Sequence, residues 1–293
     1  MCAMCFIISC VRPGKNVFLL FSHSNLNMLL CGLILNTKMT LSKNKIKLLN
    51  SLTRKKERDE LNFFVAEGSK LVLELADSFH CSLLLATTEW LLEHRQIKAD
   101  EIVDVDENEL KKVSNQKTPQ GVLAVFEKPV YSWNPVDIKQ RLSLALDDVQ
   151  DPGNMGTILR IADWFGINDI FCSFCCADAF SPKVVQASMG AIARVRVHTV
   201  DLADFLQDCA RHIPVYGTFM DGNDIYDSEL HVNGIIVMGN EGNGISENVR
   251  QIISHKLLIP NFPKGVPTSE SLNVGVAAAL VCAEFRRRQS GGK

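Results

Sequence analysis

The sequence has no excess of charge of either sign, because 31 lysines and arginines stand against 33 aspartates and glutamates, a formal net charge of −2. This balance excludes a protein that binds nucleic acid through bulk positive charge alone, while local basic patches stay compatible with it. Hydrophobic residues make up 46% of the 293 residues, which excludes a mainly disordered chain. The length suits one large domain or two ordinary ones, and the pattern below favours two.

A run long enough to span a membrane is also missing. Residues 1–38 contain no acidic residue, but polar side chains at 22–27 interrupt the apolar stretch, and the run at 28–35 is too short to cross a bilayer. No small-residue cleavage site marks a secretory signal, which stays the alternative. We expect residues 1–38 to be a dispensable extension or a mis-assigned start, with a normal-looking start at Met39 and no membrane partner.

The ten cysteines lack the regular spacing of a disulfide scaffold, so a reducing cytoplasm is the predicted location. Cys172, Cys175 and Cys176 resemble half of a metal site. No second C-x-x-C pair or histidine pair follows to complete a tetrahedron, and we therefore predict no metal.

Residues 39–128 read as a small α/β unit. The pattern predicts a helix over 43–58, a strand over 62–68, a helix over 69–77, and strands over 81–87 and 121–129. The first helix carries seven basic residues against one acidic residue, Glu57. Such a run is either a solvated helix face or a nucleic-acid contact. The polar, proline-containing stretch that follows predicts a linker over residues 129–140.

Residues 141–293 alternate strands with helices. The strand candidates are residues 144–149, 169–172, 194–198, 215–219, 235–239 and 256–259. Helical stretches between them predict an α/β fold with a largely parallel sheet that is covered on both faces. Ligands bind such folds at the carboxyl ends of the strands, where glycine-rich turns let the backbone approach closely.

The first such turn lies in the sequence DDVQDPGNMGTILRIADWFG, residues 147–166. It predicts a turn over 151–154 and a helix that begins near Gly156, with Asn154 as its cap. Arg160 follows one helical turn later and can present a planar cation to a phosphate or carboxylate. A structural cap and an ordinary surface arginine explain this motif equally well.

The second turn, IIVMGNEGNGIS at residues 235–246, leads a buried strand into a loop shaped by glycine. It matches neither G-x-G-x-x-G nor G-x-x-x-x-G-K-[ST], which disfavours a nucleotide-dependent oxidoreductase and a P-loop site. Glu241 would repel phosphate but suits a hydroxyl or a cationic ligand. A purely structural turn is the alternative.

The third turn, over residues 259–288, delivers Ser269, Ser271 and Asn273 onto the start of a helix rich in small residues. The run at 275–279 permits close packing, either in the core or at a subunit contact. Ser271 can equally be a plain N-terminal helix residue. No G-x-S-x-G elbow accompanies any serine, so no Ser-His-Asp triad is indicated.

These three turns, in this order, resemble the SpoU (TrmH) branch of the SPOUT RNA methyltransferases. The signatures are N-x-G-x-x-x-R (Asn154, Gly156, Arg160), G-N-E-G-x-G-I-S at 239–246 and S-L-N-V-x-V-A-A-A at 271–279. Residues 41–128 are similar to the substrate-binding domain that precedes the catalytic domain in members that modify ribosomal RNA, including a basic stretch at 54–68.

The resemblance implies methyl transfer from S-adenosylmethionine to a ribose 2′-hydroxyl. It implies a catalytic α/β domain over 141–293 with a C-terminal trefoil knot, after a small L30e-like domain, in a homodimer with the site near the subunit interface. The substrate would be RNA, since DNA lacks that hydroxyl. Ribosomal RNA is favoured, and transfer RNA is the alternative. A non-catalytic RNA-binding or ribosome-assembly module with the same fold is the other alternative.

The resemblance also assigns residues to roles. Arg160 would orient the 2′-hydroxyl and stabilise charge, because a guanidinium with a pKa above about 12 is a poor base. Asn154, Glu241, Ser271 and Asn273 match the other polar positions of the catalytic site. Cofactor contacts are expected at Thr218, Gly239, Ile259 and Leu272. RNA contacts are expected at Lys55, Lys56, Arg58 and the basic tail 286–288.

Overall fold

The computed structural model describes residues 41–263, 266 and 271–289, and residues 41–293 form one compact unit. The predicted extension at 1–38 and Ser269 lie outside the described residues. Within those described ranges, no helix combines the length and the apolar composition needed to cross a membrane.

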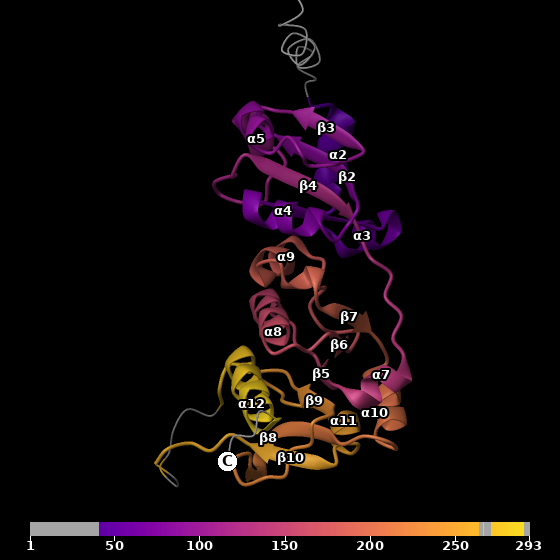
Figure 1. Ribbon diagram of the computed structural model, residues 1–293, viewed down its shortest axis with the longest axis vertical. Coiled ribbons are helices and arrows are strands. Elements are labelled where there is room, and N and C mark those ends of the chain that lie inside the picture. Colours follow the sequence, from indigo (N-terminus) through magenta and orange to yellow (C-terminus); the bar gives the residue numbers. More distant parts are fainter. Residues whose placement is uncertain (1–40, 264–265, 267–270, 290–293) are drawn as a thin grey trace, which may run out of the picture. The chain divides into compact units, whose positions relative to one another are not determined.

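The first sheet has four strands in the order β1-β4-β2-β3 (Figure 1). These are β1 (Phe63–Glu67), β2 (Cys81–Ala86), β3 (Glu101–Asp104) and β4 (Val122–Glu127). Strand β4 is antiparallel to β1 and β2, whereas β2 and β3 are parallel. The helices around it are α2 (Lys43–Ser51), α3 (Lys55–Leu61), α4 (Ser69–Ala76), α5 (Thr88–Glu93) and α6 (Glu107–Lys111).

The single helix predicted over 43–58 is wrong, because the chain forms two helices there. Leu52 is fully buried and ends α2, and Arg54 is extended before α3 starts. Burial of Leu52 in the core therefore turns the chain between two segments of equally helical composition. The sequence pattern also missed α5, β3 and α6, which are short elements in a polar stretch.

The second sheet has six strands in the order β10-β8-β9-β5-β6-β7, and every pair is parallel, as predicted. The strands are β5 (Leu142–Leu146), β6 (Asp169–Cys172), β7 (Arg196–Thr199), β8 (Val215–Asp224), β9 (Gly234–Met238) and β10 (His255–Leu258). The helical elements are α7 (Pro135–Gln140), α8 (Pro152–Trp164), α9 (Pro182–Ser188), η1 (Ala191–Ala193), α10 (Leu202–Cys209), α11 (Glu247–Arg250) and α12 (Val274–Gln289).

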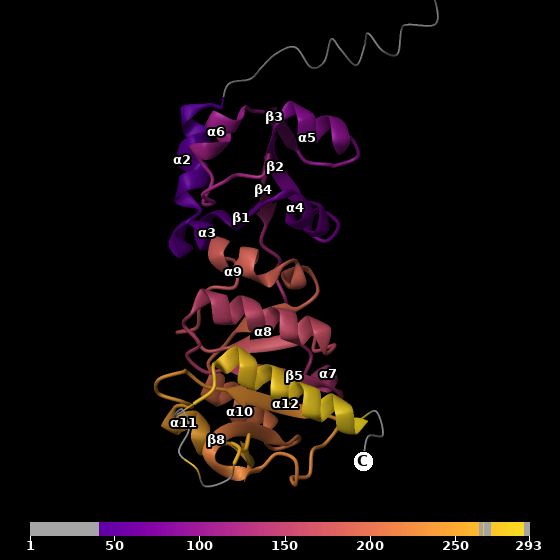
Figure 2. The same cartoon turned by 90° about the vertical axis from the view of Figure 1, so that its left-hand side faces the viewer.

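Helices cover both faces of this sheet. Alternate residues of the central strands, such as Leu144 and Ile236, pack with α8 and α12. Their neighbours Ala145 and Ile235 pack with α7, α10 and α11 on the opposite face. Figure 2 shows α8 and α12 side by side on the face toward the viewer. The prediction of a parallel sheet covered on both faces is confirmed.

Helix α8 begins earlier than predicted. Asp151 is its N-cap and accepts a hydrogen bond from the Asn154 backbone N–H at 2.8 Å, and Pro152 follows in the first turn. Asn154 is therefore not the cap, and the predicted start near Gly156 is wrong. Since a proline is well suited to the first helical position, the D-P pair starts the helix and releases the Asn154 side chain for other contacts.

The segment around α9 packs against the first sheet. Phe180, Val185 and Ile192 share one hydrophobic cluster with Phe64 and Phe126 of β1 and β4. The rings of Phe180 and Phe64 lie 5.1 Å apart. A buried apolar contact of this kind holds the two sheets together within residues 41–293.

Candidate active site

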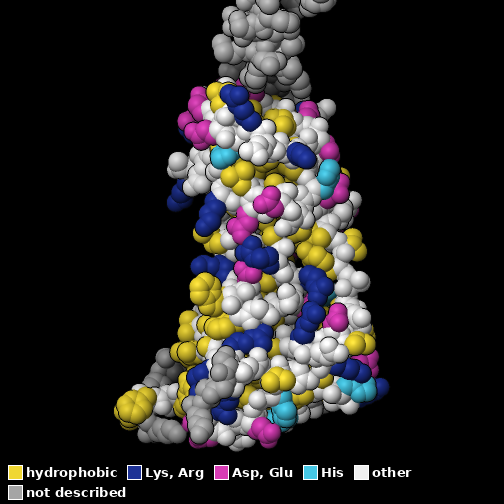
Figure 3. Space-filling model, in the orientation of Figure 1, with side chains coloured by type: hydrophobic (Ala, Val, Ile, Leu, Met, Phe, Trp, Pro, Cys, Tyr) yellow, Lys and Arg dark blue, Asp and Glu magenta, His cyan; other side chains and the backbone are white. Residues whose placement is uncertain are grey.

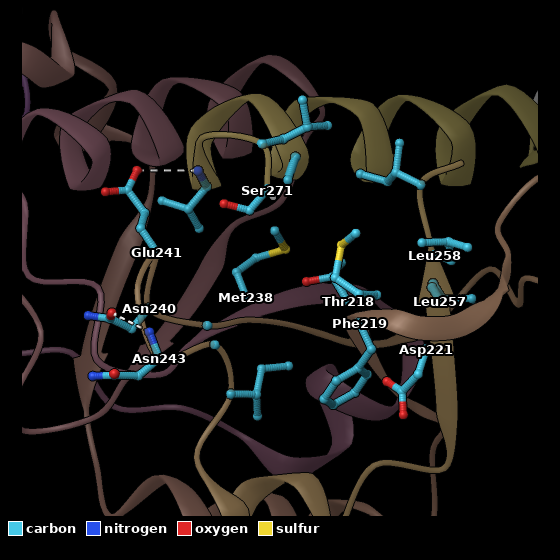
Figure 4. A pocket seen from close by; sticks show the side chains of 18 of the residues that line it. Thr218, Phe219, Asp221, Met238, Asn240, Glu241, Asn243, Leu257, Leu258 and Ser271 are labelled. Atoms are coloured by element: carbon cyan, nitrogen blue, oxygen red, sulfur yellow. Dashed lines mark hydrogen bonds between the residues drawn. The ribbon is translucent and has the colours of Figure 1, made fainter. Parts of the chain in front are cut away.

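A pocket of about 540 Å³ opens between the middle of β8, the ends of β9 and β10, and the start of α12. Its size is within the usual range for small-molecule sites. Glu241, Ser271, Met238 and Thr218 surround this cavity (Figure 4). The site lies at the carboxyl ends of parallel strands, where the sequence pattern placed it.

The four positions predicted for cofactor contact all line this pocket. Thr218 comes from β8, Gly239 follows β9, Ile259 follows β10, and Leu272 precedes α12. The remaining lining is largely apolar and includes Met238, Ile245, Leu257, Leu258 and Ala277. Segments distant in the sequence thus form one largely apolar wall.

The loop after β9 folds back on itself. The Asn240 side-chain oxygen accepts hydrogen bonds from the backbone N–H groups of Gly242 (2.8 Å) and Asn243 (3.0 Å), and its amide donates to the Asp148 carbonyl at 2.8 Å. A Cβ on Gly239 would lie 2.4 Å from the Gly244 carbonyl carbon. Only glycine at 239 therefore lets the two ends of this loop meet.

The three catalytic signatures meet at one carboxylate. Glu241 Oε1 accepts hydrogen bonds from the side-chain amides of Asn154 and Asn273, both at 2.7 Å. The Asn273 amide also donates to Asn154 Oδ1 at 2.9 Å, and Asn273 Oδ1 accepts from the Gly275 backbone at the start of α12. The network fixes the positions of α8, the loop after β9 and α12 relative to one another.

A second cavity of about 240 Å³ adjoins the first. Glu241, Asn240, Gly242 and Val274 line both cavities, and Asn154 lines only the second. Glu241 therefore stands between two chambers. Such an arrangement suits a reaction in which two ligands meet, one from each side of the carboxylate network.

Arg160 and Ser271 are placed differently. Ser271 lines the larger cavity. Arg160 lies on the exposed side of α8, lines neither cavity, and forms no ion pair or side-chain hydrogen bond with any residue that the structure describes. Its guanidinium is thus available to an external anion or hydroxyl.

Sequence reasoning missed a charged cluster at the far side of the larger cavity. The Arg250 guanidinium lies 4.6 Å from the centroid of the Phe219 ring and donates to Asp221 at 2.8 Å. All three side chains line the cavity. No local motif signals this cluster, because β8 and α11 supply its members separately.

Arg58 is not an RNA contact, and this prediction was wrong. The Arg58 side chain is 2% exposed, and its guanidinium donates to Asp178 Oδ2 from Nε at 3.0 Å and to the Leu52 carbonyl at 2.8 Å. Lys55 and Lys56 are exposed as expected, with Lys56 3.7 Å from Glu60. RNA contact by these two lysines stays a prediction.

The basic tail is also engaged in the fold. Arg287 and Arg288 both pair with Glu284 at about 2.8 Å, and Arg286 donates to the Phe165 carbonyl at 2.7 Å. The two arginines hold the pKa of the Glu284 carboxyl down to about 2, against the penalty of burial. These arginines anchor α12, and RNA contact by residues 286–288 stays a prediction.

The three neighbouring cysteines do not converge on one point. Cys172 is buried at the end of β6, whereas Cys175 is exposed. A contact with Cys172 lowers the pKa of the Cys176 thiol to about 7, helped by Ser173. Within the part of the chain that the structure describes, no group of three metal-ligating side chains is positioned to hold an ion.

Comparisons with known proteins agree with this geometry. The model of the SpoU rRNA methylase family matches residues 141–283, and that of the MRM3-like substrate-binding domain matches residues 43–124. The 23S rRNA (guanosine(2553)-2′-O)-methyltransferase RlmP of Bacillus subtilis is 29% identical over 83% of this chain and 96% of its own.

Solved structures extend the likeness to the whole described fold. A protein of the TrmH RNA methyltransferase family from Porphyromonas gingivalis is 43% identical, with a TM-score of 0.77 over 85% of this chain and 99% of its own. An AdoMet-bound rRNA methyltransferase from Sinorhizobium meliloti is 28% identical, with a TM-score of 0.73 over 85% and 96%. The chain therefore belongs to the SpoU rRNA methylase family.

Proposed function

We propose that this protein transfers the methyl group of S-adenosylmethionine to a ribose 2′-hydroxyl of ribosomal RNA. The observation that carries the proposal is the Asn154–Glu241–Asn273 network, which joins the three sequence signatures of the family between two adjoining cavities. Relatives named as 2′-O-methyltransferases of 23S rRNA support ribosomal RNA over transfer RNA.

The larger cavity fits S-adenosylmethionine by its chemistry. Its apolar wall suits an adenine ring, and the loop after Gly239 offers backbone groups to a ribose. Asp221 and Glu241 place carboxylates near a ligand that carries a sulfonium and an ammonium, and Arg250 can meet its carboxylate. Thr218, Gly239, Ile259 and Leu272 would hold the cofactor, and the sulfonium would supply the methyl group.

The chain's own residues would position the acceptor. The smaller cavity, lined by Asn154 and Glu241, would take the target ribose. Arg160 would orient the 2′-hydroxyl and a neighbouring phosphate from the exposed side of α8, and stabilise the charge as the proton leaves. The network would keep Glu241 fixed while this happens. Ser271 lies in the larger cavity and would contact the ligand there.

We include in the proposal a homodimer, a C-terminal trefoil knot, an L30e-like first domain, a cytoplasmic location, and the absence of a metal or membrane partner. Apolar side chains support the homodimer. Val276 and Leu280 of α12 are exposed in one stripe, and Trp164 of the neighbouring α8 is 85% exposed. Pairing of this face would cover the stripe and bring subunits together beside the catalytic loops.

The non-catalytic alternative makes a different prediction. If the proposed function is correct, the midpoint temperature of thermal unfolding should rise by several degrees with S-adenosylmethionine or S-adenosylhomocysteine at concentrations far above the dissociation constant. The reason is that a ligand that binds only the folded state stabilises it. An RNA-binding module without the cofactor site would show no shift with either compound. Tritium transfer to ribosomal and transfer RNA in parallel then separates the two substrate classes.

A further inference from the structure

Ion pairs with acidic residues neutralise several basic residues of the segment predicted to bind RNA. Lys45 pairs with Glu101, Arg54 with Glu57, and Arg58 is buried against Asp178. Three other exposed lysines, Lys70, Lys117 and Lys183, form no ion pair with any described residue. They belong to α4, to the loop 114–120 before β4, and to α9.

Contacts around the loop 114–120 bring these three segments together. The Gln116 amide donates to Gln186 of α9 at 3.0 Å, and Lys183 lies one helical turn before Gln186. A Cβ on Gly68 would lie 2.9 Å from Gln120 Oε1, so the start of α4, with Lys70, adjoins the same loop. Lys117 stands between these two contact points.

Hydrogen bonds to Glu67 hold the loop in place, and Glu74 forms an ion pair with an arginine. Glu67, 6% exposed, accepts hydrogen bonds from the Ser114 hydroxyl and from the Asn115 backbone at 2.8 Å. Glu74 of α4 pairs with Arg194 at 2.6 Å. Neither the loop nor α9 contains an acidic residue. The three lysines therefore stay available to phosphate, beside amide groups that can bond phosphate and ribose oxygens.

This surface lies close to the catalytic helix. Ala187, next to Gln186, packs so tightly on α8 that a Cβ on Gly156 would lie 2.4 Å from its Cβ. Helix α8 carries Asn154 and Arg160, and packed helices lie about 8–10 Å apart. In Figure 3, Lys and Arg side chains appear together with Asp and Glu side chains at the levels where Figure 1 places α4, α9 and α8.

We propose that Lys70, Lys117 and Lys183, with the amides of the loop 114–120, bind the phosphate backbone of the RNA substrate a few nucleotides from the methylated ribose. The proposal rests on the proposed function for the identity of the ligand. The pair between Arg58 and Asp178 and the packing of Phe180 against Phe64 keep this surface at a fixed position relative to α8. The surface thus sets which nucleotide reaches Arg160.

The test compares pairs of variants that remove the same charge. Protein saturated with S-adenosylhomocysteine is titrated with a transcribed, unmodified fragment of 23S ribosomal RNA over a range of salt concentrations. The double variant Lys117→Gln/Lys183→Gln is compared with the control Lys98→Gln/Lys139→Gln. Lys98 is exposed in the segment before β3, and Lys139 is exposed on α7. Thermal midpoints check that both pairs fold, and Lys117→Gln alone is the reserve variant.

Affinity for RNA falls as salt rises, and we expect this dependence to be weaker in the Lys117/Lys183 variant. The slope of log affinity against log salt should become less negative by about 1.4, which is about 0.7 for each lost contact with single-stranded RNA. The control pair should keep the slope of the wild type. KM for RNA in methyl transfer should rise for the Lys117/Lys183 variant and stay at the wild-type value for the control pair. Equal slopes and affinities for the two pairs overturn the proposal. If RNA binding depends on these lysines but the protein transfers no methyl group, the inference about this surface stands and the proposed function is refuted.

Discussion

At the scale of single residues, Arg160 carries the most direct prediction. Arg160→Ala should lower methyl transfer at saturating RNA by about a hundredfold or more, because one positioned group that orients and stabilises the reacting atoms is lost. Cofactor affinity should barely change, since Arg160 lies outside the larger cavity. Single-turnover kinetics and calorimetry measure the two quantities separately.

Arg160→Lys is the matching control. A compact ammonium cannot reach a hydroxyl and a phosphate together as a planar guanidinium can, so this variant should not restore the rate. Full activity of Arg160→Lys would show that only positive charge is needed. Normal transfer by Arg160→Ala would remove Arg160 from the mechanism.

Two glycines of one loop give a second residue-scale prediction. Gly239→Ala should abolish cofactor binding and lower the thermal midpoint, because its Cβ would lie 2.4 Å from the Gly244 carbonyl carbon. At Gly242 the nearest atom to a Cβ is Asn240 Oδ1 at 3.5 Å, so Gly242→Ala should fold normally. Calorimetry with S-adenosylhomocysteine distinguishes them, and similar affinities for both variants would contradict this account of the loop.

At the scale of secondary-structure elements, α3 carries basic residues with opposite roles. Arg58→Ala should lower the free energy of unfolding by about 3 kcal/mol, because it leaves the Asp178 carboxylate without its buried partner. Lys55→Gln, on the exposed side of the same helix, should leave stability unchanged. Denaturant unfolding measures both, and a stable Arg58→Ala protein with weakened RNA binding would reinstate the sequence-based interpretation.

Helix α12 gives a prediction about pH. The pKa of Glu284 is lowered to about 2 from an ordinary value of 4.5, so its carboxylate stabilises the folded state above about pH 4.5. This contribution should be lost as the pH falls from 4.5 toward 2. Glu284→Gln should be less stable than the wild type at pH 7, and the difference should shrink over that window. Parallel stability curves for the two proteins would contradict the role of Arg287 and Arg288 as its partners.

Elements differ in how far the sequence determines them. The parallel strands and the three catalytic turns were predictable, because short apolar runs and glycine-rich turns are local properties of the chain. The burial of Arg58 was not, since its partner Asp178 lies 120 residues away. The same holds for Arg286–Arg288, whose carbonyl and carboxylate partners are brought to α12 only by packing. Charge composition alone cannot separate an RNA contact from an internal ion pair.

At the scale of the whole molecule, the site depends on segments that the fold brings together from β8, β9, β10 and the starts of α8 and α12. Asn154, Glu241 and Asn273 span 119 residues of sequence, yet they share one hydrogen-bonded network. The sequence predicted the members of this network through the family resemblance. Their hydrogen-bond partners, the second cavity and the cluster of Asp221, Phe219 and Arg250 came only from the structure.

The central claim is that methyl transfer occurs to a ribose 2′-hydroxyl of ribosomal RNA. The most direct test incubates the protein with S-adenosylmethionine and unmodified 23S ribosomal RNA, digests the RNA to nucleosides, and identifies the product by mass spectrometry. We predict one 2′-O-methylnucleoside in the digest and, in the undigested RNA, one phosphodiester 3′ to that nucleotide that resists alkaline cleavage; with Arg160→Ala the product should form about a hundredfold more slowly. A base-methylated nucleoside, or no methylated product in a protein that binds both ligands, would contradict the claim.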